Sequence, residues 1–72
     1  MNHGLYNFRE PYSVDDAKSI VRVAKKYRKR ALVELEDAKR NDYSLGVKIH
    51  SETVARYDAT IAHFERWLKE HA

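Results

Sequence analysis

The chain has 72 residues and a mass of 8.5 kDa, which is enough for one domain but too little for a large hydrophobic core. It contains no cysteine, so disulfides, thiolate metal sites and cysteine nucleophiles are excluded, and stability must come from packing or association. With 35% charged residues, two glycines and one proline, the composition predicts an all-α protein and disfavours β-architectures.

The chain carries no sign of a membrane or export segment. A membrane-spanning helix needs about 18 to 20 consecutive apolar residues, and no apolar run in the sequence is that long. The N-terminus lacks the basic and then apolar profile of a signal peptide. We therefore expect a cytoplasmic protein that does not bind membranes.

The first twelve residues form an irregular segment rich in aromatic side chains, which we call the arm (residues 1–12). Tyr6, Phe8 and Tyr12 lie in it, together with Gly4 and Pro11. Its pattern predicts no helix or strand of its own. The arm either covers part of the protein's own core or docks on a partner, since aromatic side chains of this kind dominate interface hot spots.

A first helix is predicted over residues 14–41. Ser13 precedes it as an N-cap, and Asp15 and Asp16 place negative charge in the first turn, where exposed backbone N–H groups favour it. One face of this helix carries two series that repeat every seven residues, which are Ala17, Ala24, Ala31 and Ala38, and Val14, Val21, Arg28 and Leu35. Such a face is typical of a helix that packs on another helix.

A second helix is predicted over residues 45–71, after the turn-forming residues 41–44. Ser44 is a candidate N-cap, but Gly46 weakens a helix by about 1 kcal/mol relative to alanine, so a start at Ser51 is the alternative. The earlier start is favoured because one series alternates spacings of three and four residues, namely Val47, His50, Val54, Tyr57, Ile61, Phe64, Leu68 and His71.

The two faces match if the chain reverses between Asp42 and Tyr43, because residues whose numbers add up to 85 then face each other. Small residues of one helix then meet large residues of the other, as in antiparallel knobs-into-holes packing. We therefore predict an antiparallel, coiled-coil-like two-helix hairpin with an N-terminal extended arm, forming a single domain over residues 1–72. Arg28 either stacks on Tyr57 beside Asp58, or forms a polar layer that sets register or oligomeric state.

Two helices alone cannot enclose a core, and some apolar residues lie beside the predicted helix interface. The arm, a second copy of the chain or another protein must cover them. We expect a homodimer that completes a four-helix bundle. The residues predicted to form a protein interface are Tyr6, Phe8, Ile20, Val23, Tyr27, Ile49 and Trp67.

The net charge of +3 arises from the first predicted helix, because residues 18–30 contain seven basic residues and no acidic residue. Four of the basic residues are predicted within about 60° of one another, almost opposite the alanine series. The pattern fits a solvated helix face, a surface for nucleic-acid phosphates, or a contact with an acidic protein. The candidate binding residues are Lys18, Arg22, Lys25, Lys26, Lys29 and Arg30.

The four histidines follow no metal-binding spacing, because no two are four residues apart and no acidic residue lies three positions before any of them. His50 and His71 are expected at the ends of the helix interface, and His63 on the surface. The chain also lacks a phosphate-binding glycine loop and a paired-carboxylate motif. We expect no enzyme activity, metal, cofactor or small-molecule substrate.

These observations favour a non-enzymatic helical interaction module that binds and modulates a larger protein or assembly. Its small size fits a phage or bacterial accessory regulator. The alternative is a protein that binds RNA or DNA without sequence specificity, through the basic face of the first helix.

Overall fold

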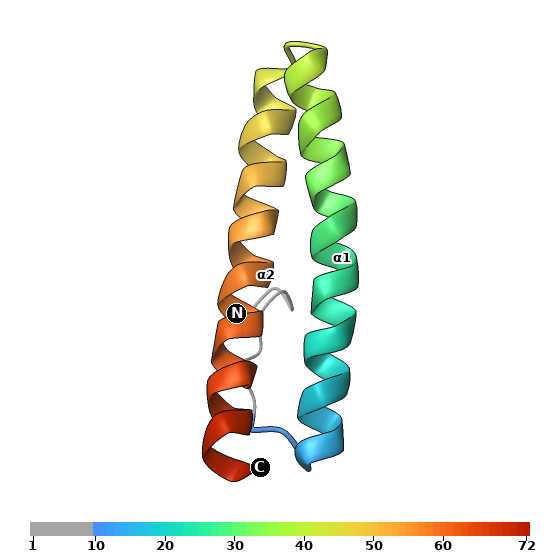
Figure 1. The fold of residues 1–72 in the computed structure, drawn as a ribbon. Coiled ribbons are helices and arrows are strands. Elements are labelled where there is room, and N and C mark those ends of the chain that lie inside the picture. The colour runs from blue at the N-terminus through green and yellow to red at the C-terminus, as the bar shows by residue number, and fades with distance from the viewer. Residues whose placement is uncertain (1–9) are drawn as a thin grey trace.

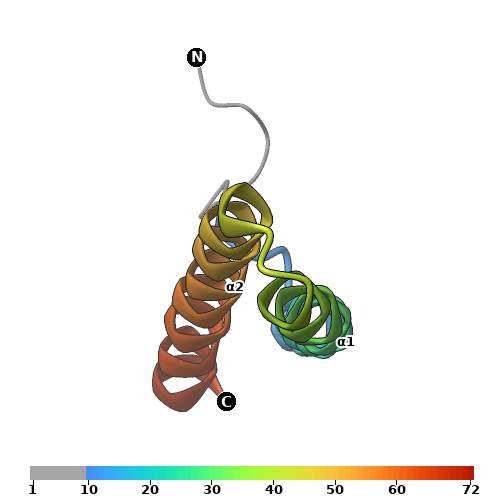
Figure 2. The ribbon, with the colours of Figure 1, turned by 90° about the horizontal axis from the view of Figure 1, so that it is seen from above.

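The computed structural model describes residues 10–72, which form two α-helices. α1 spans Val14–Arg40 and α2 spans Ser44–His71. The helices run antiparallel and lie side by side, and the described residues contain no strand (Figure 1). Seen from above, α1 is viewed almost end-on while α2 runs obliquely, so the two helices cross at an angle (Figure 2). The predicted all-α hairpin is therefore confirmed, whereas Tyr6, Phe8 and the rest of residues 1–9 lie outside the described part.

α1 begins with the predicted cap. The hydroxyl of Ser13 accepts a hydrogen bond from the backbone N–H of Asp16 at 3.1 Å, and the Asp16 carboxylate accepts one from the backbone N–H of Tyr12 at 2.8 Å. The helix ends one residue earlier than predicted. Asn41 bonds back to the carbonyl of Asp37 through both its backbone and its side chain, and Asp42 has a left-handed φ of 53° that turns the chain.

α2 begins at Ser44, which confirms the earlier of the two predicted starts. The expected cap by Ser44 is wrong, because Tyr43 occupies the N-cap position and makes no side-chain capping bond. Gly46 explains the tight entry into the helix. A Cβ at this residue would lie 2.5 Å from Cδ2 of Tyr43 and 3.1 Å from Cβ of Ala38, so a larger residue would require the exposed Tyr43 ring and α1 to shift.

The core is a narrow seam between the helices, and its residues belong to the series predicted to face each other. The buried residues of α1 are Ala17, Val21, Ala24, Ala31, Leu35 and Ala38. Opposite them, Phe64 of α2 is only 1% exposed, whereas most of the other large residues of that series are half-buried. His71, expected at the end of the seam, is exposed. The seam thus buries small residues on α1 and leaves the larger ones of α2 only partly covered.

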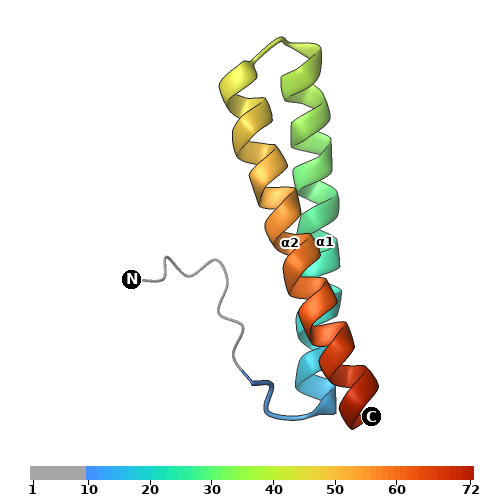
Figure 3. The same ribbon diagram turned by 90° about the vertical axis from the view of Figure 1, so that its left-hand side faces the viewer.

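The described end of the arm crosses the open end of the hairpin (Figure 3). The indole N–H of Trp67 donates a hydrogen bond to the carboxylate of Glu10 at 3.2 Å, and Pro11 is buried. These contacts connect the segment before α1 to the last turns of α2. Within residues 10–72, no helix has an apolar stretch that could cross a membrane.

Candidate interaction surface

The seam between the helices has two edges, and their side chains differ in chemistry. One edge, which we call the apolar flank, is a groove of about 320 Å³ lined by Ser19, Ile20, Val23, Ala24, Tyr27, Tyr57 and Thr60. The other edge, which we call the charged flank, is a groove of about 420 Å³ lined by Lys25, Arg28, Lys29, Leu32, Asp58 and Ile61. Both grooves are formed by both helices.

The apolar flank keeps hydrophobic side chains in contact with solvent. Val23 is 45% exposed and Tyr27 is 42% exposed, while Ile20 is half-buried. The ring of Tyr27 stacks on that of Tyr57, with centroids 6.4 Å apart and an angle of 21° between the planes. The hydroxyl of Thr60 already donates to the carbonyl of Arg56 at 3.0 Å. The groove therefore offers a preorganised aromatic pair and aliphatic carbons.

The charged flank is bridged by ion pairs between the helices. Arg28 donates through Nε to Oδ1 of Asp58, and Nζ of Lys25 lies 3.2 Å from Oε2 of Glu65. Arg28 thus takes Asp58 as its partner, while Tyr57, which the sequence suggested as its stacking surface, lies against Tyr27 instead. Because these pairs are partly exposed, water screens them and each adds little stability.

The predicted basic residues do not form one free row. Lys25 is paired with Glu65, and Nη2 of Arg22 donates to Oγ of Ser19 at 3.2 Å. The four basic residues expected almost opposite the alanine series are Lys18, Arg22, Lys25 and Lys29. This expectation is wrong, because Lys25 and Lys29 line the edge of the seam itself. Four candidates make no ion pair with any residue from 10 to 72, and these are Lys18, Lys26, Lys29 and Arg30.

Two further residues predicted to form an interface differ in their surroundings. Ile49 is 48% exposed and lies nearer the turn. Trp67 was expected to lack cover, but it is half-buried. Its indole bonds to Glu10 and stacks on the ring of His71, with ring centroids 4.1 Å apart. Spacing on one helix face could not show the contact with Glu10, because the two residues are far apart in the sequence.

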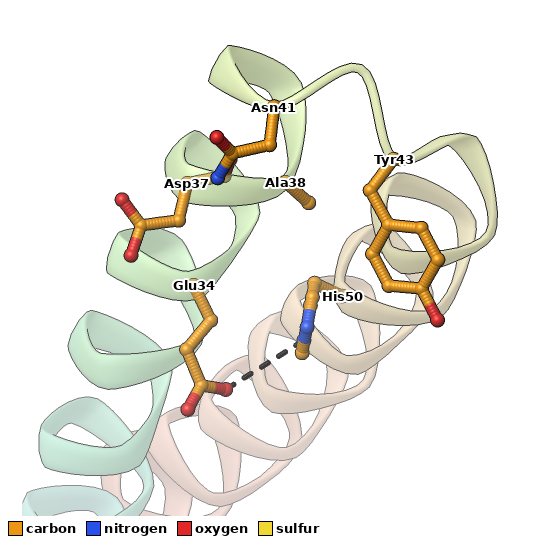
Figure 4. A pocket seen from close by; sticks show the side chains of 6 residues that line it. All are labelled: Glu34, Asp37, Ala38, Asn41, Tyr43 and His50. Atoms are coloured by element: carbon orange, nitrogen blue, oxygen red, sulfur yellow. Dashed lines mark hydrogen bonds and ion pairs between the residues drawn. The ribbon is translucent and has the colours of Figure 1, made fainter.

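A third hollow, which is polar and has a volume of about 460 Å³, lies beside the turn (Figure 4). Its lining residues are Glu34, Asp37, Ala38, Asn41, Tyr43 and His50. The carboxylate of Glu34 points across the seam to His50, with Oε1 3.6 Å from Nδ1 (Figure 4). Sequence reasoning placed His50 at the end of the seam but missed Glu34, which lies just outside the heptad series. Across residues 10–72, no group of three or more acidic or histidine side chains could hold a metal ion.

His63 also differs from its predicted place. It is half-buried rather than exposed, because its ring packs edge-on against Phe64 with centroids 4.9 Å apart. The core aromatic residue therefore has a polar neighbour on the helix surface.

No protein-family model matches the chain, and no curated protein or solved structure is significantly similar to it.

Proposed function

We propose that this chain is a non-enzymatic helical interaction module that binds a larger protein or assembly through its apolar flank and thereby modulates it. The observation that carries the proposal is the exposure of Val23 and Tyr27 in a groove lined mainly by carbon. Grouped apolar side chains at the surface of a small protein mark a binding surface more often than isolated ones do.

The shape of the groove supports a protein as the bound molecule. It runs between two helices and combines a tyrosine pair with aliphatic side chains, which are residue types suited to the centre of protein interfaces. An apolar helix face from another protein fits such a groove. The hairpin holds these side chains on rigid elements, so little order has to be gained on binding.

A pair of valine substitutions tests the proposal. Val23→Glu places a charge in the groove, whereas Val33→Glu places the same charge at an isolated valine of α1 that is 60% exposed. We expect proteins that co-purify and cross-link with the wild-type chain to be lost with Val23→Glu and kept with Val33→Glu. Equal retention by both variants would contradict the proposed use of the apolar flank.

The second candidate function is nucleic-acid binding without sequence specificity. The observation in its favour is that Lys18, Lys26, Lys29 and Arg30 pair with no carboxylate among residues 10–72, which leaves them available for phosphates. Binding to a generic RNA and a generic DNA duplex at two salt concentrations tests it, because each phosphate contact adds to the salt dependence. Absence of binding at low salt would remove this function.

A further inference from the structure

Charged residues continue the apolar flank in both directions along α1. Val23 lines the groove, Asp16 lies seven residues before it, and Arg30 lies seven residues after it. Seven residues correspond to nearly two helical turns, so the three residues follow one line on the helix surface. Asp16 and Arg30 are therefore about 21 Å apart along the helix, with Val23 midway between them.

α2 carries the same arrangement with the charges reversed. Thr60 lines the groove, and His63 lies next to it on the helix surface, three residues later. Arg56 lies seven residues before His63, and Glu70 lies seven residues after it. This second pair of charges is thus also about 21 Å apart, with His63 at its midpoint.

Contacts across the seam show that the two midpoints lie at the same level. Arg28 pairs with Asp58, and Tyr27 stacks on Tyr57, so residues whose numbers add up to between 84 and 86 lie side by side. The numbers of Val23 and His63 add up to 86. The two charge series are therefore centred on one level of the hairpin.

The two series place basic residues toward the turn and acidic residues toward the open end, while Glu34 and Glu52 lie one helical turn beyond Arg30 and Arg56. Arg30 and Arg56 lie level with each other toward the turn, and Asp16 and Glu70 lie level with each other toward the open end. Glu10, which bonds to Trp67, adds a carboxylate to the acidic end. The apolar groove lies between the two ends.

We infer that the molecule that covers the apolar flank is a second copy of this chain, packed antiparallel on the first. The two-fold axis passes perpendicular to the helices at the level of Val23 and His63. Arg30 of each copy then faces Asp16 of the other, and Arg56 likewise faces Glu70. This inference goes beyond the proposed function, because it assigns the flank to a second copy and not to a larger protein, and the tests below separate the two.

Charge selects this orientation over the other two-fold arrangement. An axis parallel to the helices would place α1 of one copy on α2 of the other at the same level. Arg30 would then face Arg56, and Asp16 would face Glu70, so like charges would meet at both ends. In the antiparallel arrangement the same side chains form four contacts between opposite charges instead.

The antiparallel arrangement also covers the exposed apolar side chains. Val23 lies at the axis and meets its own copy. Ile20 and Tyr27 lie on opposite sides of Val23 along α1, so Ile20 of one copy comes opposite Tyr27 of the other. The groove is thereby removed from water and the two hairpins form a four-helix bundle.

Two neighbouring cations of α1 give the first test, by sedimentation of the full chain. We expect the wild type to have twice the 8.5 kDa mass. Arg30→Glu should raise the dimer Kd about tenfold, because two symmetry-related attractions become repulsions. Lys29→Glu makes the same change in net charge on the charged flank and should leave the Kd within about twofold of the wild type.

A charge exchange on α2 gives the second test. Arg56→Glu and Glu70→Arg should each weaken the dimer, since each places like charges opposite one another. The double variant contains the same numbers of charges as the wild type and restores opposite signs, so its Kd should return to the wild-type range. A double variant weaker than both single variants would overturn the antiparallel arrangement.

The remaining outcomes separate this inference from the proposed function. A wild-type chain that stays monomeric at its highest soluble concentration overturns the inference. If Val23→Glu then still loses a protein that the wild type and Val33→Glu retain, the apolar flank binds a different protein and the proposed function stands. If Val23→Glu loses no protein that the wild type retains, both the dimer inference and the proposed use of the apolar flank fail. Equal weakening by Lys29→Glu and Arg30→Glu would overturn the assigned interface.

Discussion

The two flanks of the seam come from the same two helices, yet they serve the fold differently. On the charged flank, Arg28 and Lys25 reach carboxylates of α2 and complete their contacts within the chain. On the apolar flank, Val23 and Tyr27 remain partly in water. The difference shows that a two-helix protein can satisfy one edge of its seam by itself and leave apolar side chains of the other edge partly in water.

The difference follows from which residues stand next to the alanine series. Ala24 is followed directly by Lys25, which emerges on the charged flank, and three residues later by Tyr27, which emerges on the apolar flank. A helix turns by about 100° per residue, so these two neighbours lie on opposite sides of the buried alanine. One helix thus presents unlike chemistry on the two sides of a single seam.

The largest effect on stability is expected from a substitution in the buried seam, on which the packing of both flanks depends. Phe64 is the most buried large side chain, and Phe64→Ala should lower the free energy of unfolding by about 3 to 5 kcal/mol. In a chain of this size such a loss should abolish cooperative thermal unfolding monitored by circular dichroism. Val33→Ala, at an exposed site, is the control and should change stability by less than about 0.5 kcal/mol.

Separating the helices should disturb both flanks together. Ala31 is 5% exposed, and Ala31→Leu should overpack the seam at a cost of about 1 to 3 kcal/mol in chemical denaturation. Ala55→Leu adds the same side chain at an exposed position of α2 and serves as the control. An Ala31→Leu variant as stable as the wild type would contradict the close packing of α1 on α2.

The charged flank alone should respond to Asp58→Asn. This change removes the ion pair with Arg28, whose side chain is 37% exposed, so the loss should be at most about 1 kcal/mol after screening by water. We expect the difference from the wild type to shrink as salt is added. Urea denaturation at low and high salt measures it, and a salt-independent difference would show that the pair does not act through charge.

The smallest effect on the isolated hairpin is expected on the apolar flank. Val23→Thr should change the stability of the dilute protein by less than about 0.5 kcal/mol, because Val23 is already 45% exposed. The melting temperature of the wild type should rise with protein concentration, whereas that of the variant should rise less. Identical concentration dependence in the two proteins would mean that this flank does not associate.

Much of the fold was readable from spacing. The heptad series of α1 and the alternating series of α2 predict which residues are buried, and Ser13 predicts where α1 begins. The exposure of Val23 and Tyr27 was also predicted, because they fall beside the series and no third helix exists among the described residues to cover them. Periodicity reports the face of a helix, so it succeeds for these features.

Periodicity fails where a contact joins different elements at the edge of a face. The partner of Arg28 depended on which of two adjacent residues, Tyr57 or Asp58, the side chain would reach. The indole N–H of Trp67 bonds to Glu10, which belongs to no repeat. Such contacts depend on the rotation of each helix and on side-chain rotamers, which spacing does not specify.

By itself, the sequence determined two helices, their antiparallel register and the narrow seam of alanines, because regular spacing and turn residues act locally along the chain. Only the tertiary structure decided that ion pairs between the helices bridge one edge of the seam, and that a tyrosine pair lines the groove at the other edge. It also placed the two charge series of the apolar flank at one level. That alignment depends on how α1 and α2 are set against each other in space, and this setting decides which side chains the exposed flank presents together.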